Sequence, residues 1–135
     1  MSQQNVEVVR RVTEAILGRD EEAFVEGCRP DVQWEENTSV YPGLRPVYVG
    51  HVGARRWFSE VTDPWSEMHA ERADYLDGKG DCVVVDLTLS ARGKASGVET
   101  TLRAWFVVWL IDGKIARRQL FSDEEAAQRA AGLAE

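Results

Sequence analysis

The sequence predicts an α+β protein in which one curved antiparallel sheet wraps around helices and encloses an internal pocket. Amphipathic helical segments occupy most of the first half of the chain, strands fill most of the second half, and a short helix ends it. Strands that are segregated from helices in this way are typical of α+β layer architectures. At 135 residues, the chain is expected to form a single domain, 1–135, around one core. A cone open at one end would offer a natural small-molecule pocket.

A hairpin within residues 99–123 carries the strongest strand signal. Val, Ile, Trp, Phe and Leu dominate two runs that are separated by Asp112-Gly113. Glycine tolerates the positive φ that a tight hairpin turn requires, so this dipeptide predicts the turn. Because side chains alternate along a strand, Trp105 and Trp109 share one face, and Phe106 lies on the other.

The remaining elements follow from periodicity and from helix-ending signals. The expected helices cover residues 5–17, 21–28, 51–61 and a terminal segment from a capping box at 122–125 to near 132. The expected strands cover residues 32–36, 68–76 and 82–91 together with the hairpin, and the Pro- and Gly-rich segment 38–50 is expected to be an extended loop.

Composition excludes several classes of protein. The net charge of −7 argues against a nucleic-acid-binding protein, which would show a basic surface. Cys28 and Cys82 are too few for a disulfide framework or a zinc site, so we expect both to be reduced and buried. The N-terminus lacks signal-peptide features, and the apolar run 105–111 is too short to span a membrane. We therefore predict a cytoplasmic protein without membrane contact.

Six segments together resemble a known family. In order, they are NVEVVRRVTEAI, GRDEEAF, PDVQWEE, GHVGARRWFSEV, SGVETTLRAWFVVW and DGKIARRQLFSDEEAAQRAAGL. The chain resembles the SnoaL-like (polyketide cyclase-like) proteins of the nuclear-transport-factor-2-like superfamily over nearly its whole length. The resemblance implies the cone-shaped fold, a hydrophobic small-molecule ligand, no cofactor and a homodimer formed through the sheet. This fold hosts enzymes and non-enzymes, so function has to be argued from the site.

The resemblance also indicates where chemistry is located in related enzymes. The carboxylate base of ketosteroid isomerases matches Glu36, whereas their tyrosine matches Val12 and their protonated acid matches Phe106. The aspartate of related epoxide hydrolases and polyketide cyclases matches Leu120. Loss of one oxyanion donor costs about 2.7–4 kcal/mol of transition-state stabilisation. The three apolar positions therefore argue against steroid-type isomerisation, aspartate-dependent aldol cyclisation and epoxide hydrolysis.

Glu36 is the candidate catalytic residue, and two interpretations of it are open. Side chains alternate between the two faces of a strand, so Glu36 lies on the same face as Trp34. It is either a general base in an apolar site or a carboxylate at the pocket rim that pairs with Arg45 or Arg55.

Other polar side chains are weaker candidates. Asp86 interrupts an apolar strand and is either a pocket acid or a cross-strand partner of Arg103. Gln119 is a candidate hydrogen-bond donor to a ligand carbonyl, and Tyr41 and Tyr48 are candidates for a lid at the pocket mouth.

The aromatic residues Trp34, Trp57 and Phe58 are expected to line the pocket or to fill the core. His51 and His69 lie far apart in the sequence without ligand spacing, so we expect no metal site. The pair Arg117-Arg118 is expected to form a solvated strand edge.

These observations predict a protein that binds a hydrophobic small molecule. If the protein is an enzyme, the expected chemistry is a cofactor-independent isomerisation, cyclisation or dehydration that uses Glu36. The alternative is a non-enzymatic ligand-binding or dimeric interaction module that associates through the outer face of the sheet.

Overall fold

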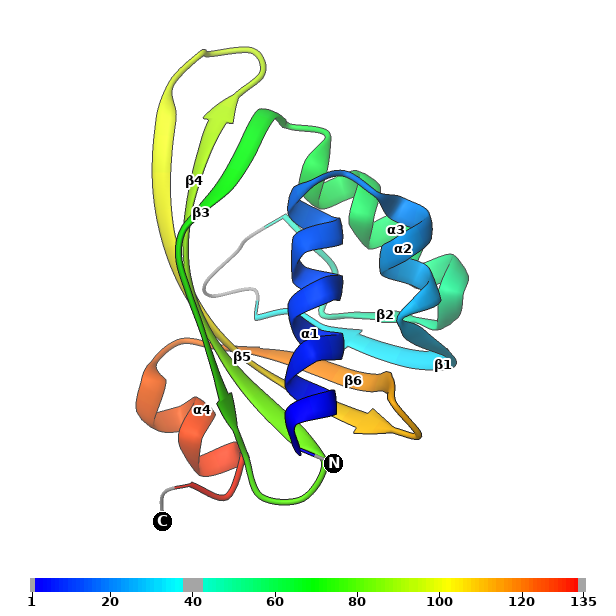
Figure 1. Ribbon diagram of the computed structural model, residues 1–135. Coiled ribbons are helices and arrows are strands. Elements are labelled where there is room, and N and C mark those ends of the chain that lie inside the picture. The colour runs from blue at the N-terminus through cyan, green and yellow to red at the C-terminus, as the bar shows by residue number, and fades with distance from the viewer. Residues whose placement is uncertain (1, 38–42, 134–135) are drawn as a thin grey trace.

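In this computed structural model, the structure describes residues 2–37 and 43–133 (Figure 1). The helices are α1 (Ser2–Leu17), α2 (Glu21–Glu26), α3 (Gly50–Thr62) and α4 (Glu124–Ala130). The strands are β1 (Cys28–Glu35), β2 (Val47–Val49), β3 (Trp65–Asp77), β4 (Cys82–Gly93), β5 (Glu99–Ile111) and β6 (Lys114–Phe121). No described helix is long and apolar enough to cross a membrane.

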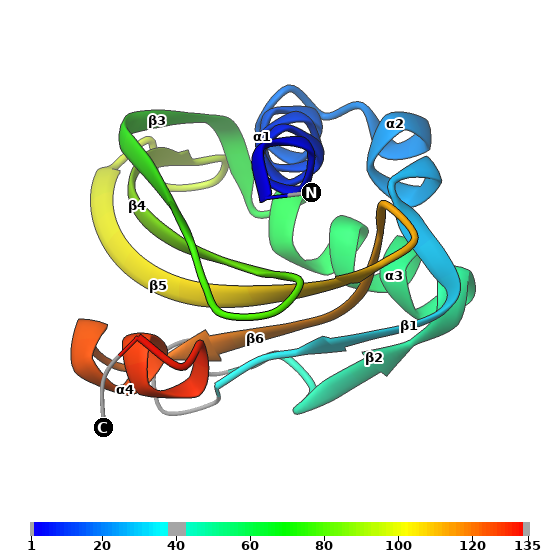
Figure 2. The same cartoon turned by 60° about the horizontal axis from the view of Figure 1, so that its bottom comes forward.

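The strands form one curved six-stranded sheet in the order β2-β1-β6-β5-β4-β3. Neighbouring strands are antiparallel except β1 and β6, which run parallel. Helices α1, α2 and α3 lie on the concave side, and α4 lies on the convex side (Figure 2). The predicted α+β fold, with a curved sheet wrapped around helices, is confirmed.

Two predicted boundaries were wrong around β1. Helix α2 ends at Glu26, and Cys28 begins β1 instead of ending the helix. The segment 38–50, which we expected to be entirely loop, contains the edge strand β2, in which Tyr48 pairs with Trp34. Pairing with an existing strand compensates for the weak local signal of a three-residue strand.

The predicted hairpin is confirmed as β5 and β6. Asp112 and Gly113 have φ angles of 52° and 77°, the two successive positive values that a type I′ turn requires. A register shift follows Trp109 in the pairing with β6. The concave face of β5 carries Phe106 and Val108, whereas Trp105, Val107 and Trp109 join the cluster under α4 on the convex side.

An aromatic cluster fixes the concave core. Phe24 of α2 is fully buried, and its ring centre lies 5.1 Å from Trp34, 5.5 Å from Trp57 and 5.7 Å from Phe58. Stacked and edge-on contacts of this kind add to the stabilisation that burial provides. Phe24 therefore holds two tryptophans in place between α2, β1 and α3.

Both cysteines are free and buried. Burial raises the pKa of Cys28 to about 12 and also raises the pKa of Cys82. Both thiols are therefore protonated at neutral pH and behave as small apolar side chains.

Phe24→Ala should lower the free energy of unfolding by about 3–5 kcal/mol, because it removes a ring from a packed aromatic cluster. Urea denaturation followed by circular dichroism measures this change. The control Val52→Ala, at a position that is 84% exposed on α3, should change it by less than about 0.5 kcal/mol. Equal stability of the two variants would contradict this role for Phe24.

Candidate functional site

A cavity of about 130 Å³ lies between α1 and the concave face of the sheet. Almost all of its wall is apolar. Helices α1 and α3 contribute Val9, Val12, Thr13, Ile16, Leu17, Trp57 and Val61. The sheet and the residue after β1 contribute Trp34, Glu36, Met68, Leu87, Leu89, Leu102, Arg103, Ala104, Phe106, Val108, Ile115, Arg118 and Leu120.

The cavity has a closed end and a more open end. Val9, Val108 and Ile115 are buried. Ile16, at the end of α1, and Met68, near the start of β3, are only partly buried. This gradient of exposure places the mouth between the last turn of α1 and the first residues of β3.

The buried polar feature of this cavity is an ion pair between Glu36 and Arg118. Arg118 Nη1 donates hydrogen bonds to Glu36 Oε1 at 2.7 Å and to the backbone oxygen of Glu35 at 3.1 Å. The indole Nε1 of Trp57 donates to Glu36 Oε2 at 2.8 Å. The side chains of Glu36 and Arg118 are only 2% and 7% exposed, so the pair is shielded from solvent.

Glu36 is therefore not a rim carboxylate bound by Arg45 or Arg55. Arg55 instead forms ion pairs with Glu21 and Glu22 of α2. The alternation of side chains along the strand correctly predicted that Glu36 shares a face with Trp34: both residues line the cavity.

Three aromatic rings surround the guanidinium of Arg118. Its Cζ atom lies 4.9 Å from the ring centre of Trp34, 5.4 Å from that of Trp57 and 4.7 Å from that of Phe106. The electron-rich faces of aromatic rings attract a cation, and they do so most strongly when it is desolvated. Within the described part of the chain, hydrogen bonds are made only by Nη1 of this side chain.

Sequence reasoning missed Arg118. The expectation that Arg117-Arg118 is a solvated edge was wrong for Arg118, which is buried in the cavity wall. A signal was present in the sequence: Arg118 lies two residues from Leu120, so alternation places both on one face. The resemblance had already assigned Leu120 to the pocket.

A second Glu–Arg pair lies directly behind the first one. Glu35 and Arg117 pair on the convex face, where their side chains are 25% and 42% exposed, and the Arg117 guanidinium lies 4.7 Å from the Trp109 ring centre. The two pairs have the same chemistry and adjacent sequence positions, but only the concave pair is shielded from water. The convex pair is therefore a matched control for the concave one.

Comparison with known proteins identifies the family. The family model for the SnoaL-like domain matches residues 9–118. This chain belongs to the SnoaL-like family. No curated protein matches the chain significantly.

Solved structures similar to this SnoaL-like protein share its fold. An NTF2-like protein of unknown function from Burkholderia pseudomallei is 25% identical with a TM-score of 0.77, covering 97% of this chain and 98% of that one. TerC co-crystallized with polyporic acid is 24% identical with a TM-score of 0.76, covering 95% and 97%. A proposed polyketide cyclase from Xanthomonas campestris is 15% identical with a TM-score of 0.78, covering 99% and 98%.

All four positions that the resemblance assigned to chemistry line the cavity of this SnoaL-like protein: Val12, Glu36, Phe106 and Leu120. Three of them are apolar, and Glu36 supplies the carboxylate. Arg118 introduces hydrogen-bond donors beside Phe106, where the resemblance had indicated that none remained.

The aromatic candidates separate into cavity and core. Trp34 and Trp57 line the cavity. Tyr48 does not: it is buried in β2, and its hydroxyl donates to Glu60 and accepts from the backbone N–H of Arg45. Phe58 is also buried in the core and does not line the cavity. Tyr41 lies outside the described residues.

The polar candidates Asp86 and Gln119 lie on the convex face, so the structure does not bring them to the cavity. Asp86 pairs with Arg103 at 3.0 Å, which is the cross-strand alternative. Gln119 Oε1 accepts a hydrogen bond from Nη2 of Arg117 at 2.9 Å. Each faces away because its strand neighbour, Leu87 or Leu120, faces the cavity.

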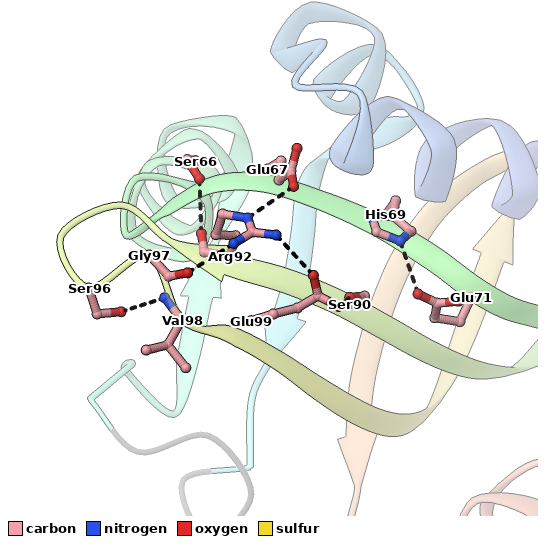
Figure 3. Close-up of polar contacts among 10 residues, drawn as sticks. All are labelled: Ser66, Glu67, His69, Glu71, Ser90, Arg92, Ser96, Gly97, Val98 and Glu99. Carbon is pink, nitrogen blue, oxygen red and sulfur yellow. Dashed lines mark hydrogen bonds and ion pairs between the residues drawn. The ribbon is translucent and has the colours of Figure 1, made fainter.

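The histidines lie apart from the site. His51 Nε2 lies 3.0 Å from the backbone oxygen of Cys28 and thereby links α3 to β1. His69 on β3 lies 3.0 Å from Glu71 (Figure 3). Among the described residues, no three His, Cys, Asp or Glu side chains come together as a metal-binding group.

Arg92 braces the end of the β4–β5 hairpin, which extends beyond the helices (Figure 1). Its guanidinium donates to Glu67 on β3 and to Glu99 on β5, at 3.3 and 3.2 Å, and also to the backbone oxygen of Gly97 at 3.0 Å (Figure 3). These contacts hold the first residues of β3 and β5 together beside the cavity mouth.

Arg118→Met should lower the free energy of unfolding by about 3–5 kcal/mol, because it leaves the buried carboxylate of Glu36 without its cation. The double variant Glu36→Gln/Arg118→Met should recover most of this loss. Arg117→Met should cost about 0–1 kcal/mol, because the convex pair is partly solvated. Chemical denaturation compares the variants, and similar losses for Arg118→Met and Arg117→Met would contradict this assignment of the shielded pair.

Proposed function

We propose that this protein binds a hydrophobic small molecule in the cavity and that Glu36 transfers a proton to or from this molecule. The chemistry is a cofactor-independent isomerisation, cyclisation or dehydration. The observation that carries the proposal is the shielded pair of Glu36 and Arg118 in a cavity whose wall is otherwise mostly apolar.

The cost of the pair supports a functional role. Desolvating two charges is expensive, and replacing a buried ion pair with apolar residues is often neutral or stabilising. Packing alone therefore gives little reason to keep charges in this wall. Ionisable groups in a cleft, with specific partners, are candidates for functional sites.

Arg118 would hold the ligand through an oxygen atom. Its Nη1 is already occupied by Glu35 and Glu36, whereas Nε and Nη2 have no hydrogen-bond partner among the described residues. A fixed cationic donor in a site that excludes water stabilises negative charge as it develops on a carbonyl oxygen. Arg118 would thereby perform the task that Val12 and Phe106 cannot perform.

Glu36 would act as the base. It takes a proton from a carbon next to the carbonyl, the C–H electron pair moves into an enolate, and Arg118 binds the enolate oxygen. Return of the proton to another carbon of the enolate completes an isomerisation. The hydrogen bonds from Arg118 and Trp57 leave room for this step, because an ionised carboxylate has about four lone-pair sites.

Glu36→Gln should reduce enzyme-dependent proton exchange by about 10²–10⁴-fold, because the amide cannot act as the general base. The measurement is hydrogen–deuterium exchange of cyclohex-2-enone in D₂O, followed by NMR. The control Glu35→Gln changes the glutamate on the convex face and should exchange at the wild-type rate. Equal rates for wild type and Glu36→Gln would exclude the catalytic role.

A non-enzymatic ligand-binding or interaction module is the second candidate, and two contacts on the convex face favour it. Arg103 lies 4.8 Å from the ring centre of Trp105, and Arg117 lies 4.7 Å from that of Trp109. Tryptophan and arginine are enriched in protein interfaces. This candidate includes a homodimer formed through the sheet.

Light scattering tests the dimer. The expected mass is twice the 15.2 kDa of one chain. Trp109→Glu should shift the protein to the monomer, because it places a charge in the interface between the two sheets. Val52→Glu, on the helical side, should leave the dimer intact. The measurement uses a protein concentration on the order of 50 µM, at which weak complexes form. A wild-type monomer at this concentration would contradict the predicted dimer.

A further inference from the structure

We infer that the cavity selects a single-ring, uncharged carbonyl compound, whose oxygen is bound by Arg118 together with the indole N–H of Trp34. The inference rests on the proposed function, since it concerns the ligand of the same cavity. Three independent features support it: the cavity volume, an unfilled hydrogen-bond donor and the balance of charge.

The volume limits the size of the ligand. The cavity holds about 130 Å³. For comparison, an apolar protein cavity of about 150 Å³ accommodates benzene. One six-membered ring therefore matches this space, and a fused multi-ring compound would have to extend out through the open end. Substituents on the ring would extend past Ile16 and Met68 toward the mouth.

The second feature is the indole N–H of Trp34. It is fully buried and has no hydrogen-bond partner in the described structure, and the residue is only 3% exposed. Buried polar groups in folded proteins nearly always have a partner. Trp34 lines the cavity, and its ring centre lies 4.9 Å from Cζ of Arg118. The Trp34 nitrogen itself exposes less than 1 Å², so an acceptor on a bound molecule reaches this donor only once the ring turns slightly toward the cavity. The same acceptor would then bind Nε or Nη2 of Arg118.

The charge balance determines which kind of acceptor fits. Glu36 and Arg118 neutralise each other, so the buried site has no net charge. A carboxylate ligand would add an uncompensated negative charge close to Glu36 in a cavity with few polar groups, which is strongly unfavourable. A carbonyl oxygen accepts the same hydrogen bonds without that charge. The site therefore favours ketones, aldehydes or esters over acids.

An NMR titration of the ¹⁵N-labelled protein tests the inference with acetophenone, ethylbenzene and benzoate. The three probes share one ring and differ in the acceptor and in charge. Acetophenone should bind on the order of tenfold more tightly than either of the others, because a hydrogen bond to a charged donor contributes this much. The indole N–H resonance of Trp34, assigned with Trp34→Phe, should shift with acetophenone and not with ethylbenzene.

Trp105 provides an internal control, because its indole N–H is also buried without a partner among the described residues but lies on the convex face. Its resonance should stay in place with all three probes. In the double variant Glu36→Gln/Arg118→Met, acetophenone should lose its preference over ethylbenzene.

Each outcome decides between the claims. Equal binding of ethylbenzene and acetophenone, tighter binding of benzoate, or an unmoved Trp34 resonance would overturn the inference and leave the hydrophobic cavity intact. If no probe binds, the proposed function fails together with the inference.

Discussion

The ion pair between Glu36 and Arg118 is the interaction on which the interpretation of this SnoaL-like protein depends. Its side chains are nearly inaccessible to water, and its surroundings are aromatic or aliphatic. The Trp57 indole completes the hydrogen bonding of the carboxylate, and three rings surround the guanidinium. Such a pair contributes little to stability compared with apolar packing, but loss of either partner is costly. Its position in a cavity wall makes a binding role the simplest explanation.

The parallel pairing of β1 with β6 creates this arrangement. The two strands are far apart in the sequence, and their register places Trp34 beside Arg118 and Glu35 beside Gln119. Because side chains alternate, one Glu–Arg pair forms on each side of the sheet, where β6 pairs with the end of β1 and the residue that follows it. The helices cover only the concave pair. The same two residue types therefore form a solvated surface contact on one face and a shielded polar site on the other.

Much of the fold was predictable from local patterns, because helix periodicity and the Asp-Gly turn act over short distances. The position of Glu36 was predictable for the same reason. Alternation with Leu120 could have placed Arg118 in the pocket as well. The pairing of Arg118 with Glu36 was not predictable, since it depends on the long-range pairing of β1 with β6. Asp86 and Gln119 were candidates for the pocket on the basis of residue type, and strand alternation places both on the opposite face, where Asp86 forms the alternative cross-strand pair with Arg103.

The cavity keeps the carboxylate of Glu36, and the cation of Arg118 supplies the hydrogen-bond donors that Val12 and Phe106 lack. The most direct test of this account is a high-resolution crystal structure of the protein grown with cyclohex-2-enone. The account predicts density for one ring in the cavity, with its oxygen within hydrogen-bonding distance of Arg118 and with Glu36 still paired. A cavity that is filled by its own side chains, with Arg118 turned toward solvent, would contradict it.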